Sequence, residues 1–265
     1  MSNSLIIGRY VQGQSFIHRL DPRLKLVLSF YLITLVLFAN NVLTYSMLFI
    51  LMFSIIYLSK ISVKFFVNGL KGLIWLILFT VLLQLLFSTG SHVYLSWGII
   101  KITQEGCLLA IYTFLRFVLI VCFSTVLTLT TAPLELADAT ESLLRPLAKW
   151  KVPVQEIALM ISIALRFIPT LMDEATTIMN AQKARGVNFN QGSLITRAKA
   201  IIPILVPLLV SSFNRAEQLA DAMEARGYQT DFPRSHYRKL AWQKKDTGSL
   251  ILIVVLTIVF FYIRT

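Results

Sequence analysis

Two Ala-Arg-Gly triplets, Ala184-Arg185-Gly186 and Ala225-Arg226-Gly227, end two long helical patterns in the middle of the chain. Glycine after the last turn takes the left-handed conformation that ends a helix, and arginine in that turn complements the negative end of the helix dipole. Alanine before the arginine allows another backbone to approach closely. An exposed arginine on a rigid helix tip suits charge-assisted hydrogen bonding in an acidic groove, which is binding chemistry rather than catalysis.

The triplets belong to an internal repeat. At an offset of 41 residues, positions 175–186 match positions 216–227 at five places: three alanines, the arginine and the glycine. A single Ala-Arg-Gly is most simply an ordinary helix C-cap. Repetition of a unit at matched positions indicates two similar tasks, so we expect two equivalent docking points for two similar partner subunits.

The other reactive side chains do not form a catalytic pattern. The three histidines are scattered, and the two cysteines lie fifteen positions apart, too far on one helix for a disulfide. The carboxylates have the spacing of a solvated helix face rather than a catalytic dyad. The chain has no Gly-x-x-x-x-Gly-Lys-Ser/Thr, the P-loop sequence. The sequence therefore predicts a non-enzymatic chain that binds no metal or cofactor. The carboxylates in question are Asp138, Glu141, Asp173 and Glu174.

Composition places the chain among membrane proteins. Hydrophobic residues make up 56% and charged residues 14%, against about 25% charged in soluble domains. Because a spanning helix needs about 20 mostly apolar residues, the sequence predicts an all-α polytopic membrane protein with about five transmembrane helices. The net charge of +12 is not accompanied by a nucleic-acid recognition motif. We therefore expect the chain to contact the lipid bilayer and not to bind nucleic acid. The predicted spans are 24–39, 42–58, 73–87, 107–129 and 249–263.

The basic residues predict the orientation. They are frequent before the first span and between the second and third, whereas the turn at Asn40-Asn41 has none. We therefore expect a multi-pass protein of the cell membrane with the N-terminus and the segment after the fourth span in the cytoplasm.

That segment carries 15 of the 25 basic residues and three helical patterns, 133–149, 153–185 and 193–226. The second and third patterns are apolar in their first halves and charged in their second halves. The sequence thus predicts a membrane domain at 1–131, cytoplasmic coupling helices at 132–247 and a final transmembrane helix at 248–265. Two further spans in place of the long coupling helices remain an alternative, although the apolar halves contain a charge and prolines.

Three prolines and two arginines interrupt apolar stretches. Pro169, Pro203 and Pro207 are expected to bend the long helices where they pass from membrane to cytoplasm. Arg166 needs a partner if it is buried, and Asp138, Glu141 or Glu156 could form a salt bridge with it. Arg116, in the fourth span, makes a polar contact inside the bundle or with a partner, or extends to the interface. The sequence leaves these readings of Arg116 open.

These motifs together resemble the transmembrane T component of energy-coupling factor (ECF) vitamin transporters. The resemblance covers nearly the whole chain and is carried by Asp21-Pro22-Arg23-Leu24-Lys25, by Leu165-Arg166-Phe167-Ile168-Pro169 and, most specifically, by the two Ala-Arg-Gly triplets. Asp21 and Pro22 also mark the start of the first span, because Asp caps free amides and Pro suits the first helical position.

The resemblance implies a scaffold that couples two ABC-type ATPases to a small substrate-binding membrane protein, the S component. Arg185 and Arg226 would each enter a groove of one ATPase, and the ATPases would bind ATP and magnesium. Two other classes are less favoured by the residues. An intramembrane enzyme would need converging His, Asp or Glu, and a stand-alone transporter or channel usually has inverted repeats and discontinuous helices.

Overall fold

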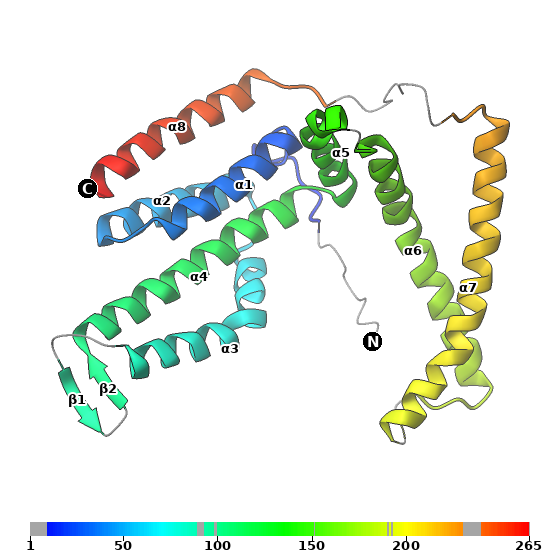
Figure 1. The fold of residues 1–265 in the computed structure, drawn as a ribbon, viewed down its shortest axis with the longest axis horizontal. Helices are drawn as coiled ribbons and strands as arrows, with labels where there is room; N and C mark the ends of the chain where they lie inside the picture. The colour runs from blue at the N-terminus through cyan, green and yellow to red at the C-terminus, as the bar shows by residue number, and fades with distance from the viewer. Residues whose placement is uncertain are drawn as a thin grey trace. The chain divides into compact units, whose positions relative to one another are not determined.

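The computed structural model describes residues 10–88, 93–97, 100–150, 152–189, 191, 193–229 and 240–264. They form eight α-helices, one 3-10 helix and one two-stranded hairpin (Figure 1). The chain divides into two compact units: the first consists of Met1–Leu143 and Leu240–Thr265, and the second of Leu144–Lys239. The predicted all-α polytopic fold class is confirmed, with the hairpin as a small addition.

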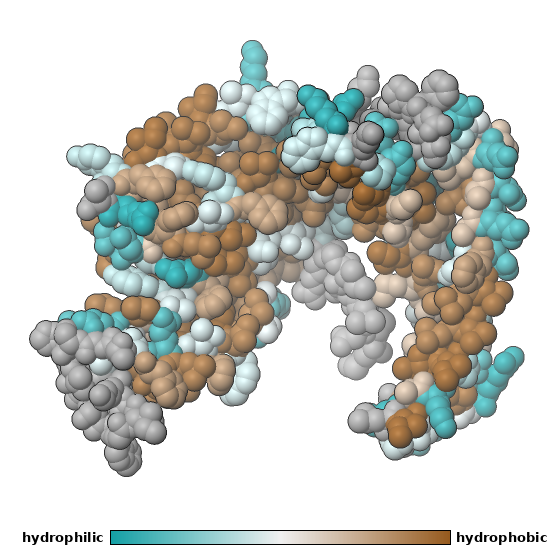
Figure 2. All heavy atoms as spheres, in the orientation of Figure 1, coloured by the Kyte–Doolittle hydropathy of each residue, from teal (hydrophilic) through white to brown (hydrophobic). Residues whose placement is uncertain are grey.

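The first unit is a bundle built around α4 (Gln104–Thr130). This helix contacts α1 (Pro22–Leu37), α2 (Val42–Ser59) and α3 (Val63–Phe87), and α8 (Lys244–Arg264) packs on α2. The core is apolar, as the composition demands: Val36, Leu48, Leu119 and Phe260 are fully buried. Outside this core the helices expose large hydrophobic side chains, which Figure 2 shows as brown surface over much of the bundle.

The second unit contains two long helices, α6 (Val154–Ala184) and α7 (Leu194–Ala225), preceded by the 3-10 helix η1 (Arg145–Trp150). Ser193 caps α7 by accepting a hydrogen bond from the backbone N–H of Thr196. At a rise of 1.5 Å per residue, each helix is about 47 Å long. The start of α7 at Ser193 and the ends of both helices at the Ala-Arg-Gly triplets are as predicted.

Six helices of the described chain are long and apolar enough to cross a membrane: α2, α3, α4, α6, α7 and α8. The set differs from the five predicted spans. The first predicted span corresponds to α1, which has only 16 residues. Conversely, α6 and α7 meet the criteria of length and composition, and their assignment to the cytoplasm stays a prediction. The predicted division at residues 131 and 247 also stays a prediction.

Two helices differ in extent from the predicted ranges. The helix that contains the predicted span 73–87 begins earlier, at Val63, because Ser62 caps it and the more polar first turns are also helical. The helix predicted for 133–149 ends as α5 (Pro133–Leu144) and continues as η1, because Pro146 removes a donor and restricts the residue before it. The hairpin of β1 (Val93–Trp97) and β2 (Ile100–Thr103) was not predicted.

Candidate functional site

The two Ala-Arg-Gly triplets form the same helix cap. Arg185 is the C-cap of α6, and Gly186 has a φ of 90°. Arg226 is the C-cap of α7, and Gly227 has a φ of 75°. In each case the residue after the glycine donates its N–H to the carbonyl five positions back, Val187 to Gln182 at 3.1 Å and Tyr228 to Met223 at 3.0 Å. Both ends are therefore Schellman motifs, which fix the arginine backbone in one orientation.

All six residues of the triplets are exposed. Within the described part of the chain, neither Arg185 nor Arg226 forms an ion pair or a side-chain hydrogen bond. An exposed guanidinium on a rigid cap retains its five donors for another molecule. The local geometry is therefore suited to docking, as the residue types predict.

The two long helices are antiparallel and cross each other (Figure 1). At the crossing, Arg215 of α7 donates to Glu174 of α6 at 3.3 Å and lies 5.7 Å from the centre of the Phe167 ring. Glu174 and Arg215 occupy equivalent positions of the 41-residue repeat. Contact between equivalent residues is what an approximate two-fold axis produces.

Arg185 and Arg226 lie on opposite sides of this crossing. Arg185 comes eleven residues after Glu174, and Arg226 eleven residues after Arg215. Each arginine is therefore about 16 Å along its helix from the crossing, in opposite directions. The unit thus presents two equivalent tips, separated by about 33 Å of helix length through the crossing.

Gly186→Ala and Gly227→Ala test the caps. An L-residue in the left-handed region costs about 1 kcal/mol, while an added Cβ meets nothing within 4 Å at either position. We expect roughly fivefold faster hydrogen exchange of the Val187 and Tyr228 amides. Gly248→Ala is the control, because Gly248 also has open space but lies inside α8 without a positive φ. If the Val187 and Tyr228 amides exchanged at the same rate in all three variants, the two helix ends would not be Schellman caps.

The interior prolines leave α6 and α7 continuous. Pro169 lies within α6, and Pro203 and Pro207 lie within α7. Figure 1 shows α7 changing direction in its first half, the half that contains both prolines. A proline inside a helix removes a hydrogen bond and bends it. That these bends lie where the helices pass from membrane to cytoplasm stays a prediction.

Arg166 is exposed on α6, and no ion pair joins it to Glu156 in the second unit. Arg116 lies within the bundle, where its Nη2 donates to the carbonyl of Ala39 at 3.5 Å. That carbonyl follows the end of α1, where the helix dipole favours a cation. The structure therefore favours the polar contact inside the bundle among the readings left open for Arg116.

Asp21 and Pro22 begin α1, and the Asp21 carboxylate accepts from the backbone N–H of Arg23 at 2.8 Å. The Asp21 N–H donates in turn to Oδ1 of Asp246, and Oδ2 of Asp246 accepts from the N–H of Gln243 at 2.7 Å. Asp246, only 1% exposed, thus satisfies the first amides of both α1 and α8. The two helices consequently begin at the same end of the bundle.

Lys25 belongs to the same buried group and is 7% exposed. Its Nζ donates to the carbonyls of His18 at 2.9 Å and Thr130 at 3.1 Å, joining the N-terminal segment to the end of α4. Burial lowers the pKa of His18, whose ring contacts the Val11 carbonyl and the Ser15 hydroxyl. We call Asp21, Lys25 and Asp246 the basal cluster. The role of Asp246 was not predicted, although its position three residues into α8 is that of a capping carboxylate.

Of the acidic residues named as a solvated helix face, Asp138 and Glu141 lie in the first unit, and Asp173 and Glu174 in the second. Glu174 pairs with Arg215 as described. The part of the chain that the structure describes contains no group of three or more His, Cys, Asp or Glu placed to hold a metal ion.

Comparison with known proteins gives full-length matches. A family described as cobalt transport protein (CbiQ) matches residues 13–237. The energy-coupling factor transporter transmembrane protein EcfT of Streptococcus equi subsp. equi is 55% identical over 263 residues, covering 99% of this chain and 98% of the relative. Proteins of the same name from Streptococcus thermophilus and Bacillus subtilis are 52% and 48% identical, each covering at least 99% of both chains.

Proposed function

Because this chain belongs to the CbiQ family and is the transmembrane component of an energy-coupling factor transporter, we propose that it couples two partner ATPases to a substrate-binding membrane protein. Arg185 and Arg226 each dock into an acidic groove of one ATPase. Movement of the ATPases then displaces α6 and α7 and, through them, the S component. The transported substrate is a vitamin or another micronutrient.

The observation that carries this proposal is the pair of identical, exposed caps on either side of the Glu174–Arg215 crossing. Two ATPases related by a two-fold axis present the same groove twice, pointing in opposite directions. The approximate two-fold relation of α6 and α7 matches that requirement. The arginine side chain also supports the proposal, because a guanidinium pairs with a carboxylate through two parallel hydrogen bonds.

The rest of the long helices supplies a surface for the S component. Large hydrophobic side chains are exposed in the first half of α7, including Ile201, Ile202, Leu205 and Leu209. Figure 2 shows this part of α7 as brown surface. A membrane-embedded partner covers such a surface without bringing it into water. The chain itself stays non-catalytic, and ATP and magnesium bind to the ATPases.

In this proposal the N-terminus, α5, α6 and α7 lie on the cytoplasmic side. The positive charges of the N-terminal segment and of the Lys60–Lys71 connection support that side. Single cysteines at the exposed positions Lys64 and Ser193 should be protected from a membrane-impermeant thiol reagent in intact cells and react after lysis. Labelling of intact cells at both positions would overturn the orientation.

The composition of the complex tests the function. We expect the tagged chain, gently extracted from its native membrane, to co-purify with two ATPase subunits and at least one small membrane protein. Its ATP hydrolysis should be lost when the ATPases are removed. A chain that emerges alone, under conditions that preserve other ABC complexes, would instead favour a stand-alone transporter or channel.

A further inference from the structure

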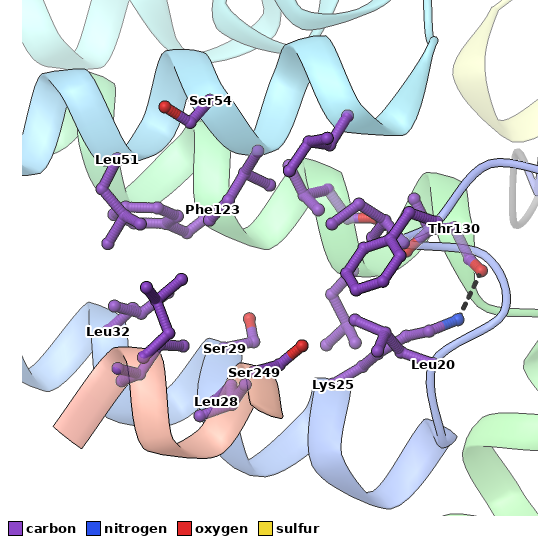
Figure 3. Close-up of a pocket in the computed structure, with 18 residues that line it drawn as sticks. Leu20, Lys25, Leu28, Ser29, Leu32, Leu51, Ser54, Phe123, Thr130 and Ser249 are labelled. Atoms are coloured by element: carbon purple, nitrogen blue, oxygen red, sulfur yellow. Dashed lines mark hydrogen bonds between the residues drawn. The ribbon is translucent and has the colours of Figure 1, made fainter. Parts of the chain in front are cut away.

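A partly open cavity of about 150 Å³ lies between the helices of the first unit (Figure 3). Its walls come from α1, α2, α4 and α8 and from the N-terminal segment before α1. Most of the lining is aliphatic or aromatic, for example Leu32, Leu51 and Phe123, and Ser54 lies on the α2 side. The bundle is therefore incompletely filled by its own side chains, unlike the close-packed interior of a typical protein.

The size and chemistry of the cavity restrict its occupant. Water needs two to four polar partners, and most of this wall offers none, because the lining is apolar apart from Lys25, Ser29, Ser54, Thr130 and Ser249. A helix has a diameter of about 10–12 Å and is too wide for a space of this volume. A hydrocarbon chain is narrow, apolar and abundant around transmembrane helices. The occupant that fits is therefore a segment of a lipid acyl chain.

One end of the cavity is polar and basic. Lys25 and Thr130 line this end and are hydrogen-bonded to each other, as Figure 3 shows. Here α1 and α8 begin and α2 ends, so exposed lysines of two helices lie a few residues beyond the lining: Lys60 follows Leu58, and Lys244 and Lys245 precede Ser249. A negatively charged headgroup at this end would be complementary to these lysines.

We propose that this cavity is a binding site for an anionic phospholipid. One acyl chain occupies the cavity, and the phosphate lies at the basic end, toward Lys60, Lys244 and Lys245. The site is distinct from the docking arginines, and it does not depend on which ATPases or S component the chain binds.

The cavity is tested by Ser54→Phe with Ser46→Phe as its control. Both serines are exposed on α2 and donate to the carbonyl four residues back, but only Ser54 lines the cavity. Each variant complex would be delipidated, exposed to phosphatidylglycerol vesicles, repurified, and measured for retained lipid by native mass spectrometry. We expect Ser54→Phe to retain at least tenfold less phosphatidylglycerol than the parent and Ser46→Phe to retain as much.

The basic end is tested by Lys244→Gln with Lys245→Gln. This variant should lose the preference for phosphatidylglycerol over phosphatidylcholine. The control, Lys64→Gln with Lys71→Gln, removes the same charge from exposed positions on α3 and should keep the preference.

Three results would overturn the proposal. They are equal lipid retention by Ser54→Phe and Ser46→Phe, equal retention of the two lipids by the parent, and capture of a partner subunit instead of lipid by a photo-crosslinker at position 54. None requires transport activity, so these outcomes are distinguishable from a failure of ATPase coupling.

Discussion

Reversing both docking charges, by Arg185→Glu with Arg226→Glu, is expected to abolish transport and to release both ATPases from the membrane chain. Each arginine lies exposed on a rigid cap, and a carboxylate in its place would face the acidic groove that we propose on the partner. Losing a charged partner in a buried contact costs about 2–5 kcal/mol. Two such losses correspond to a fall in affinity of at least about a thousandfold. Co-purification of the ATPases, compared with that of the parent chain, measures the effect.

Two further variants separate docking from folding. Lys199→Glu reverses an exposed charge on the same helix as Arg226, so it should leave ATPase binding intact. Arg185→Lys with Arg226→Lys keeps the charge but removes the planar fork, and should weaken binding while retaining some transport. Normal transport by the double glutamate variant, with both ATPases still bound, would contradict the docking assignment.

The second large effect is expected from Asp246→Ala. The Asp246 carboxylate accepts hydrogen bonds from the amides of Asp21 and Gln243 and is almost completely buried. Its removal leaves two amides without that partner, at about 1–3 kcal/mol each, and takes a negative charge from the neighbourhood of Lys25. We expect the bundle to be destabilised by about 2–5 kcal/mol, with a clear fall in the midpoint of thermal unfolding.

Asp246→Asn is the matched control, because it keeps the size of the side chain and one acceptor oxygen. The midpoint of its thermal unfolding should lie between those of the parent and of Asp246→Ala. A thermal midpoint of Asp246→Ala within error of the parent would show that the basal cluster does not hold α1 and α8 together. Transport per folded complex should change less than stability in both variants, because the docking arginines are untouched.

Local signals in the sequence predicted much of the architecture. Cap residues placed the start of α1 at Asp21-Pro22 and the ends of α6 and α7 at the two glycines, and the helical pattern from residue 193 matches the start of α7. These features depend on neighbours within a few residues, which a sequence displays directly. The start of α3 was missed, because Lys64, Asn68 and Lys71 make its first turns polar although they remain helical.

Features that depend on distant residues were not predictable in the same way. In the sequence, Asp246 is one charged residue before the last apolar stretch. Its role as a buried hydrogen-bond acceptor depends on the amide of Asp21, 225 positions earlier. The Glu174–Arg215 pair follows the repeat offset, but an alignment alone does not state that equivalent positions touch. The cavity of the first unit is formed by four helices and the segment before α1, so no contiguous stretch of sequence predicts it.

The joining of α1 to α8 through Asp246 has a consequence for biosynthesis. A ribosome delivers α1 long before α8, and the whole second unit, Leu144–Lys239, is made in between. Until residue 246 is available, the N–H of Asp21 lacks its partner and the face of the bundle that receives α8 is uncovered. We therefore expect the incomplete bundle to expose apolar surface during the synthesis of about a hundred residues. Chains stalled before α8 should accordingly be degraded faster than full-length chains.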